Sequence, residues 1–424
     1  MDDRIWHRIC FAVCSRQRRM KVLSKIAWIV LVGCLLTVVD VGRADSLPPQ
    51  KQLRTYTLHN NPNSADISPD EQLVAIECTK TTVAADSGTK TIVEAVQIWN
   101  FREDRLVAEF PAVQTDVKPS ETGHFNYPIH GARIVRFSSD GNIVVALIDQ
   151  RIFVLRATDL AQLLTVSLDG PGVVTQNFHG FTTDSKTFVS SIELSPDGGT
   201  LAVFWASELT FGRIDLFELS SGRKILSWET PEGWSGSTNG LHWHPNGKLL
   251  LIAIPNATSC QSSHYMADVF AFNVRTGAIE YELKTGIPAP RIAVTADSRV
   301  LAVDGGCIGA RIEPKLRVFD LTSGKHLLNI SAGGESIGYS VSASADGTRF
   351  LAFVARVKRT FDWLDFVSDY ETADRKFSVW NLTNYEGIVT SQSVPNTAHS
   401  ELRLSAKGRW AVSEGKASLV YELP

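Results

Sequence analysis

The feature that most constrains the fold of this chain is a sequence pattern that occurs seven times. Each copy has a short apolar run, a polar turn, a second apolar run, a loop and a third apolar run, whose last residue is aromatic in six of the seven copies. Neighbouring turns are 49 to 70 residues apart, and they centre on Asp70, Asp140, Asp197, Asn246, Asp297, Asp346 and Lys407. A repeat of this length, rich in β-branched and aromatic residues, is typical of an array in which each copy forms one sheet.

The third repeat shows how one copy builds a sheet. Residues 191–194 are expected to form a strand, and the turn Ser195-Pro196-Asp197-Gly198 reverses the chain, because proline fixes φ, aspartate bonds its own backbone and glycine tolerates positive φ. Residues 201–204 return, and residues 214–219 alternate with period two, as a half-buried strand does. With a fourth run at 224–228, the repeat predicts a four-stranded antiparallel meander.

The two ends of the repeat array are incomplete in complementary ways. The seventh repeat ends after its third run at 418–421, and residues 52–58 read as a strand without a partner. Residues 52–58 are therefore expected to complete the last sheet, which would hide both edges. The sequence thus predicts an all-β fold, a seven-bladed β-propeller of four-stranded antiparallel blades closed by an N-terminal strand, with six or eight blades as the alternatives.

Two stretches carry a family resemblance. Ser195-Pro196-Asp197-Gly198 followed by Leu201-Ala202, and Phe319-Asp320-Leu321-Thr322-Ser323-Gly324, resemble the repeat signature of WD-repeat and TolB-like propellers. The dipeptide Trp-Asp itself is absent from the chain, and Trp99-Asn100 and Trp380-Asn381 come nearest, so the exported bacterial propellers are the closer match. The resemblance covers nearly all of residues 45–424. It implies the fold and no particular activity, because this repeat serves many functions.

Residues 1–44 are predicted to be a targeting segment, ahead of a single propeller domain at 45–424. Lys21 and Lys25 precede an apolar run at 26–39, and Gly42-Arg43-Ala44 fits a signal-peptidase site. Translation could also begin at Met20, in which case residues 1–19 would not belong to the protein. We therefore expect export to the periplasm or the extracellular space. The alternatives are a membrane anchor through residues 26–41 and lipidation at Cys34.

Charge and cysteine content narrow the function further. Beyond residue 44 the chain has 34 Lys and Arg against 42 Asp and Glu, a balance of −8 that argues against nucleic-acid binding. Cys260 and Cys307 fall in equivalent loops of neighbouring repeats, so a disulfide between them is geometrically feasible. Cys78 is expected to be a small buried apolar side chain.

Length variation is confined to one face of the predicted ring. The second connections of the blades, such as 79–94, and the crossings between blades, such as 111–130 and 169–187, share that face and differ in length, whereas the turns on the opposite face are short. Variable loops on a rigid scaffold are where binding usually occurs. The longest of them, 355–375, mixes aromatic and charged residues of the kinds that dominate binding hot spots. The candidate binding residues are Arg356, Arg359, Phe361, Trp363, Phe366, Tyr370, His124, Tyr127 and Tyr265.

No pattern in the sequence indicates catalysis. There is no Gly-x-Ser-x-Gly elbow and no phosphate-binding glycine loop. His124, His130 and His264 lack the spacing of metal ligands, so neither a metal nor a cofactor is predicted. His242 and His244 flank Trp243, and packing is the better interpretation of both. We expect a non-enzymatic scaffold for a protein, peptide or glycan. The alternatives are a lactonase-like or quinoprotein-like enzyme with a central-channel site, and a purely structural subunit.

Overall fold

The structure is a computed structural model in which a defined part of the chain is described. Apart from Arg43, the described residues belong to one compact unit, Ala44–Pro424. They are 43–44, 50–58, 62–83, 90–117, 133–178, 181–207, 212–230, 241–254, 267–287, 290–304, 315–331, 336–362, 367–391, 402–413 and 419–424. The predicted targeting segment lies almost wholly outside them. No helix in the described part of the chain is long and apolar enough to span a bilayer.

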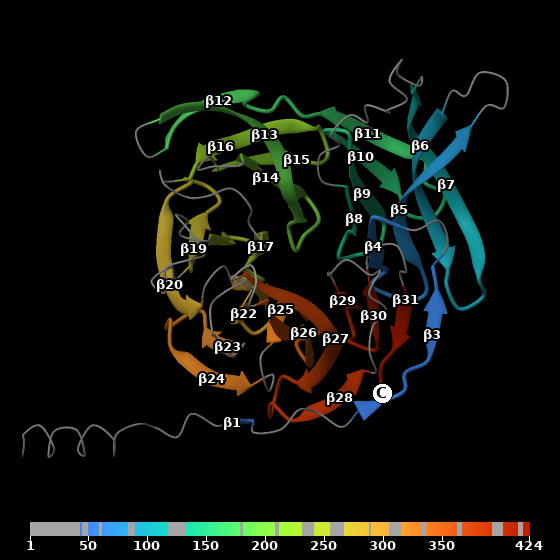
Figure 1. Ribbon diagram of the computed structural model, residues 1–424. Coiled ribbons are helices and arrows are strands. Elements are labelled where there is room, and N and C mark those ends of the chain that lie inside the picture. Colours follow the sequence, from blue (N-terminus) through green and yellow to red (C-terminus); the bar gives the residue numbers. More distant parts are fainter. Residues whose placement is uncertain are drawn as a thin grey trace, which may run out of the picture. The chain divides into compact units, whose positions relative to one another are not determined.

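The described strands form antiparallel sheets that follow the repeats (Figure 1). The first two sheets are β4 (Ser64–Ile67), β5 (Val74–Val83), β6 (Lys90–Asn100) and β7 (Arg105–Val117), then β8 (Ile134–Phe137), β9 (Ile143–Ile148), β10 (Arg151–Arg156) and β11 (Gln162–Ser167). The next two are β12 (Val173–Phe178), β13 (Phe181–Leu194), β14 (Thr200–Ser207), β15 (Gly212–Glu218) and β16 (Arg223–Glu229), then β17 (Leu241–Trp243), β18 (Leu249–Ile254), β19 (Ala267–Asn273) and β20 (Ile279–Ile287).

The remaining sheets include strands from both ends of the described chain. One contains β21 (Pro290–Val294), β22 (Arg299–Asp304), β23 (Lys315–Asp320) and β24 (His326–Ser331), with β1 (Arg43–Ala44) in the same sheet. Another contains β25 (Ser336–Ala343), β26 (Arg349–Asp362), β27 (Val367–Asn381), β28 (Gly387–Ser391) and β2 (Gln50–Lys51). The last contains β29 (Leu402–Leu404), β30 (Trp410–Ser413), β31 (Leu419–Glu422) and β3 (Thr55–Thr57).

The predicted seven-bladed propeller of uniform four-stranded antiparallel blades is wrong, because the described chain builds only six blades from a single stretch of sequence each. Among the described strands, six sheets draw four consecutive strands from one stretch of chain, and the sheet of β29, β30, β31 and β3 is a composite of the two ends. Three of the six carry a fifth strand, and β2 joins β28 in a parallel pairing. The short extra strands arise because the segment leading into the first repeat runs along outer strands before it reaches its own sheet. The pairing of residues 52–58 with the last repeat is confirmed, since Tyr56 lies opposite Val420 in an antiparallel ladder.

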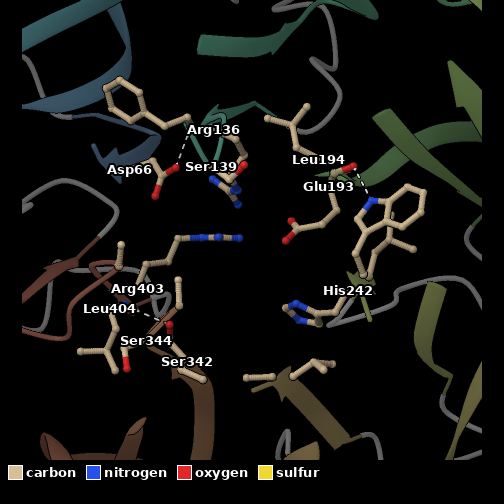
Figure 2. A pocket seen from close by; sticks show the side chains of 18 of the residues that line it. Asp66, Arg136, Ser139, Glu193, Leu194, His242, Ser342, Ser344, Arg403 and Leu404 are labelled. Carbon is tan, nitrogen blue, oxygen red and sulfur yellow. Dashed lines mark hydrogen bonds between the residues drawn. The ribbon is translucent and has the colours of Figure 1, made fainter. Parts of the chain in front are cut away.

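The first strand of each repeat faces a common centre. Contacts join β4 to β8, β8 to β13, β13 to β17, β17 to β21, β21 to β25 and β25 to β29, and β30 contacts β4. These innermost strands surround the channel seen in Figure 2. The fold is therefore a closed β-propeller within Ala44–Pro424, and the inner strands fix which side chains reach the channel.

The core lies between neighbouring sheets rather than within one of them. Each apolar cluster takes alternate residues from two adjacent sheets, as period-two strands with both faces covered require. At the ring closure, Ile76 of the first repeat packs in one cluster with Val412 and Val420 of the last. Tyr56, Phe101 and Trp410 pack in the same cluster, with ring centroids 5.0 to 5.8 Å apart. Removing either end of the ring would expose this cluster to water.

A serine-to-aspartate bond recurs in the first turn of the repeats. The hydroxyl of Ser138 donates to Asp140 at 2.5 Å, that of Ser195 to Asp197 at 2.5 Å, and that of Ser344 to Asp346 at 2.6 Å. The same aspartate oxygen accepts the backbone N–H two residues later, as in Asn142 to Asp140 at 3.0 Å. The side chain thereby closes the turn, and this explains the aspartate that marks most copies of the repeat.

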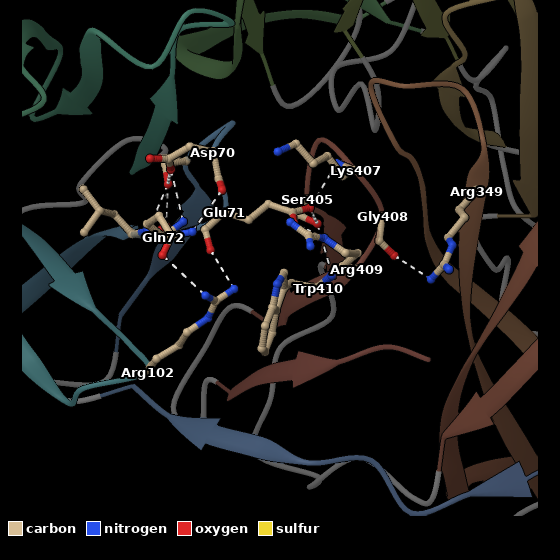
Figure 3. Close-up of polar contacts among 12 residues, drawn as sticks. Asp70, Glu71, Gln72, Arg102, Arg349, Ser405, Lys407, Gly408, Arg409 and Trp410 are labelled. Carbon is tan, nitrogen blue, oxygen red and sulfur yellow. Dashed lines mark hydrogen bonds and ion pairs between the residues drawn. The ribbon is translucent and has the colours of Figure 1, made fainter.

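The seventh repeat has Lys407 where the other turns carry a carboxylate or amide, and Glu71 of the first repeat supplies the missing group (Figure 3). One carboxylate oxygen of Glu71 accepts from the Ser405 hydroxyl at 2.6 Å and from the Lys407 backbone N–H at 3.0 Å. The other accepts from Arg409 Nε at 2.6 Å. Glu71 is fully buried and has a positive φ of 63°. The corresponding residue is glycine in five other turns, which adopts this conformation without strain; they are Gly141, Gly198, Gly247, Gly347 and Gly408.

Candidate functional site

Two predicted loops on the long-loop face are largely β-ladders. Segment 355–375 is occupied mainly by the ends of β26 and β27, which pair without interruption from Val357 opposite Thr372 to Asp362 opposite Val367. Segment 79–94 is likewise occupied by the ends of β5 and β6, paired as far as Val83 opposite Lys90. Both ladders continue past the four-stranded part of their sheets. They are second connections, so both project from the same face of the propeller, which we call the hairpin face.

Two of the predicted blade crossings also contain strand. In the crossing 169–187, β12 pairs with the first half of β13, from Val173 opposite Lys186 to Phe178 opposite Phe181. In the crossing 111–130, β7 continues to Val117 and pairs with Lys90. The hairpin face therefore carries ordered ladders where variable loops were expected, because paired strands satisfy the backbone polar groups of long connections.

The candidate binding residues are only partly placed. Arg356 lies opposite Asp374, Arg359 opposite Tyr370, and Phe361 opposite Ser368 in the β26–β27 ladder. Residues Trp363, Phe366, His124, Tyr127 and Tyr265 lie outside the described part of the chain, as do Cys260, Cys307, His130 and His264. Their roles stay predictions.

The first ladder of the hairpin face has polar contacts on its surface. Lys80 Nζ lies 2.6 Å from Glu109 of β7, and Gln97 donates to the same carboxylate oxygen at 2.6 Å. The Thr91 hydroxyl donates to Asp116 at 2.7 Å. The bond from Lys80 lowers the pKa of Glu109 below its ordinary value. These contacts join β5, β6 and β7 at the base of the projecting ladder and along it, and they hold the strands in register.

One position of the repeat lines the central channel. It lies four residues before the turn residue, on the innermost strand, and its side chains differ from repeat to repeat. The occupants are Asp66, Arg136, Glu193, His242, Ala293, Ser342 and Arg403. In Figure 2 the guanidinium of Arg403 extends towards the middle of the channel, and the carboxylate of Glu193 and the ring of His242 point inwards from the other side. His242 thus faces the cavity and is not the packing residue that its flanking position suggested.

The cavity has a volume of about 660 Å³ and a lining of mixed polar and apolar residues. Its ionisable residues are Asp66, Arg133, Arg136, Glu193, His242, Arg291 and Arg403. Asp66 is enclosed enough that burial raises its pKa above the ordinary value, although Arg403 and Arg136 oppose that shift. Arg136 is 7 % exposed and donates to the Val135 carbonyl at 2.6 Å.

Channel side chains also join adjacent inner strands. Asp66 accepts the backbone N–H of Phe137 at 2.8 Å, and the Ser342 hydroxyl accepts that of Leu404 at 3.0 Å. Ser64 and Ser340 accept from Val135 and Leu402 in the same way, each at 3.2 Å. Inner strands of neighbouring blades are too far apart for a continuous ladder, so these side chains satisfy backbone donors that would otherwise face the channel.

A buried acidic pair lies beside the channel. Arg133 forms an ion pair with Glu94, which is 2 % exposed, and donates to the Thr79 hydroxyl at 2.9 Å. Asn63 donates to Glu77 at 2.9 Å. Burial raises the pKa of Glu77 to about 7, and the nearby Glu94 adds to the shift. Arg133 is thus engaged by Glu94 and is not a free cation of the cavity.

Other groups show no catalytic arrangement in the described residues. No cluster of three or more His, Cys, Asp or Glu side chains within them could hold a metal ion. Cys78 is buried, and burial raises its pKa to about 12. His244 accepts the Asn246 backbone N–H at 3.1 Å and so replaces the serine–aspartate bond in its turn.

Comparison with known proteins supports the fold and indicates no particular function. No family model matches the chain, and no curated protein matches it. Matching solved chains number 1038, so the fold alone does not distinguish functions. One of them is a chain of the "Crystal Structure of Mitotic Checkpoint Complex", with a TM-score of 0.51 and 13 % identity over 90 % of this chain and 94 % of that one. The chain described here therefore has a WD-repeat-like β-propeller fold.

Proposed function

We propose that this chain is a protein-binding propeller that engages its partner through the hairpin face. The observation that carries the proposal is the pair of projecting ladders, β5–β6 and β26–β27, on one face of a closed ring. Paired strands present side chains at fixed spacing on a rigid base, which lowers the entropy lost on binding. The similar chain in the mitotic checkpoint complex is described as part of an assembly, which is in keeping with a scaffold role.

The proposal includes the residues and the location that the sequence suggested. Contact residues are Arg356, Arg359, Phe361, Trp363, Phe366 and Tyr370 of the sixth repeat, with His124, Tyr127 and Tyr265 elsewhere. Residues 1–44 would direct export in the manner of the TolB-like propellers of bacteria, so the partner belongs to the cell envelope. A disulfide between Cys260 and Cys307 would suit that oxidising compartment.

Shortening one ladder tests the proposal without touching the core. Residues 358–371 are replaced by Asn-Gly, which joins Val357 to its opposite residue Thr372 through a two-residue hairpin turn. The expected result is loss of partner capture from envelope extract with an unchanged unfolding midpoint. The matched control is Arg223→Gln, at an exposed side chain on an outer strand, which should capture normally. Capture that survives the shortening would contradict the assignment of this face.

A further inference from the structure

We propose that the central channel binds a small oxyanion, a molecule with carboxylate or phosphate groups, through Arg136, Arg291 and Arg403. All three line the same cavity of about 660 Å³, and each comes from the inner strand of a different repeat. The site is separate from the hairpin face and does not depend on the function proposed for it.

The charge balance of the channel differs in sign from that of the chain. The chain has a net charge of −3, yet the cavity lining holds four arginines against two carboxylates, Asp66 and Glu193. Arg133 forms an ion pair with Glu94, and the other three arginines of the lining still outnumber its two carboxylates. A locally positive cavity in an acidic protein attracts small anions and concentrates the field within low-dielectric walls.

The positions of the arginines suit the binding of an oxyanion by their guanidinium groups. Arg403 extends to the middle of the channel, and Arg136 reaches it from the next-but-one inner strand around the ring (Figure 2). Arg136 is anchored by the Val135 carbonyl at 2.6 Å and the Ser64 hydroxyl at 3.2 Å, so its position is fixed before a ligand arrives. The planar guanidinium fork matches two oxygens of one carboxylate or phosphate group.

The remaining lining sets the size and the selectivity. The cavity volume falls in the range of about 300–1,000 Å³ that is typical of small-molecule sites. Glu193 and His242 point into the same space from the opposite side. Glu193 would repel part of a large polyanion, so the lining favours a ligand with one or two acidic groups placed towards the arginines.

Titration calorimetry of the full chain at low ionic strength tests the site, with inorganic phosphate and succinate as separate probes. Saturable binding of one probe is expected, and the probe that binds identifies the ligand as a phosphate or a carboxylate. Arg403→Gln should weaken that binding about tenfold or more, because it removes a charge-assisted bond. Glu193→Gln should tighten it, because it removes a repelling charge, and a folding defect would not produce that gain.

Two further variants show whether the binding is specific to the channel. Arg223→Gln removes an exposed arginine with a side chain 71 % accessible and should leave the affinity unchanged. The variant with the shortened β26–β27 ladder should also bind the probe normally, whatever its effect on partner capture. Binding of neither probe, equal affinity in Arg403→Gln, or weaker binding in Glu193→Gln would overturn the proposal.

Discussion

Replacing Glu71 with glutamine is expected to lower the free energy of unfolding by about 2–4 kcal/mol. Glu71 is fully buried, and its two oxygens accept from Ser405, from the Lys407 backbone and from Arg409. A glutamine has one accepting oxygen, so its NH₂ group must face at least one of these donors. Hydrogen bonds to a charged group contribute about 1.5–3 kcal/mol each, and an unsatisfied buried partner adds to the loss.

The donors to the two carboxylate oxygens of Glu71 contribute unequally to the free energy of unfolding. Ser405, which is 1 % exposed, and the Lys407 backbone N–H donate to the same oxygen of Glu71, so the oxygen of a glutamine can keep both bonds but without their charge assistance. The Arg409 side chain is 53 % accessible, and an ion pair of that kind contributes about 0–1 kcal/mol. The magnitude therefore comes from the lost charge assistance in the bonds to Ser405 and Lys407, together with the NH₂ group that faces the Arg409 donor.

A double-mutant cycle with Lys407→Asp tests the role of Glu71 directly. Lys407 is exposed, and aspartate there would place a carboxylate where the turns at Asp197 and Asp346 already have one. Alone it should destabilise, because it sits against buried Glu71. Combined with Glu71→Gln it should restore part of the lost stability. Urea unfolding followed by tryptophan fluorescence measures all four proteins. Additive free energies would refute the idea that Glu71 substitutes for the missing turn aspartate.

Three further outcomes follow from the buried and turn groups. Burial raises the pKa of Glu77 to about 7, so between about pH 4.5 and 7 the unfolded chain binds fewer protons than the folded one. The free energy of unfolding should therefore fall as the pH rises across that window. In urea titrations at several pH values, Glu77→Gln should remove this dependence. The hydroxyls of Ser138 and Ser195 lower the pKa of Asp140 and Asp197, so these bonds stabilise the folded chain at neutral pH and stop doing so as the pH falls below about 4. The urea midpoints of Ser195→Ala at pH 6 and pH 3 should therefore differ less than those of the parent chain. Buried Cys78, with its pKa raised to about 12, should be alkylated only after denaturation, and peptide mapping that finds it modified in the native protein would contradict its burial.

The repeating sequence pattern was sufficient to predict a β-propeller and the closure of its ring by an N-terminal strand. The lone strand at 52–58 and the missing strand of the last repeat imply each other, and Tyr56 lies opposite Val420 as that argument requires. Two of the three fifth strands were not predictable, because β1 and β2 are two residues long and carry no periodicity. The sequence predicts a loop where β26 and β27 end, since mixed charged and aromatic residues there conceal the alternation of a strand.

The channel and the Glu71 contact were missed for a different reason. Each channel residue sits four positions before a turn, but its identity changes from Asp66 to Arg136 to Glu193, so no motif marks it. Tabulating that position across the repeats would have revealed the charged ring. Glu71 and Ser405 are 334 residues apart, and only ring closure brings them together. Lysine at 407, in a turn that elsewhere has aspartate or asparagine, was the available signal.

Site-specific photo-cross-linking in cells tests most directly whether the hairpin face binds a protein partner. A photoreactive amino acid is placed at Thr82, an exposed residue of the β5–β6 ladder, and in a second strain at Ser221, an exposed residue in a short turn of the opposite face. The account predicts a discrete cross-linked protein from position 82 and none from position 221. Adducts from position 221 alone, or from both positions alike, would contradict it.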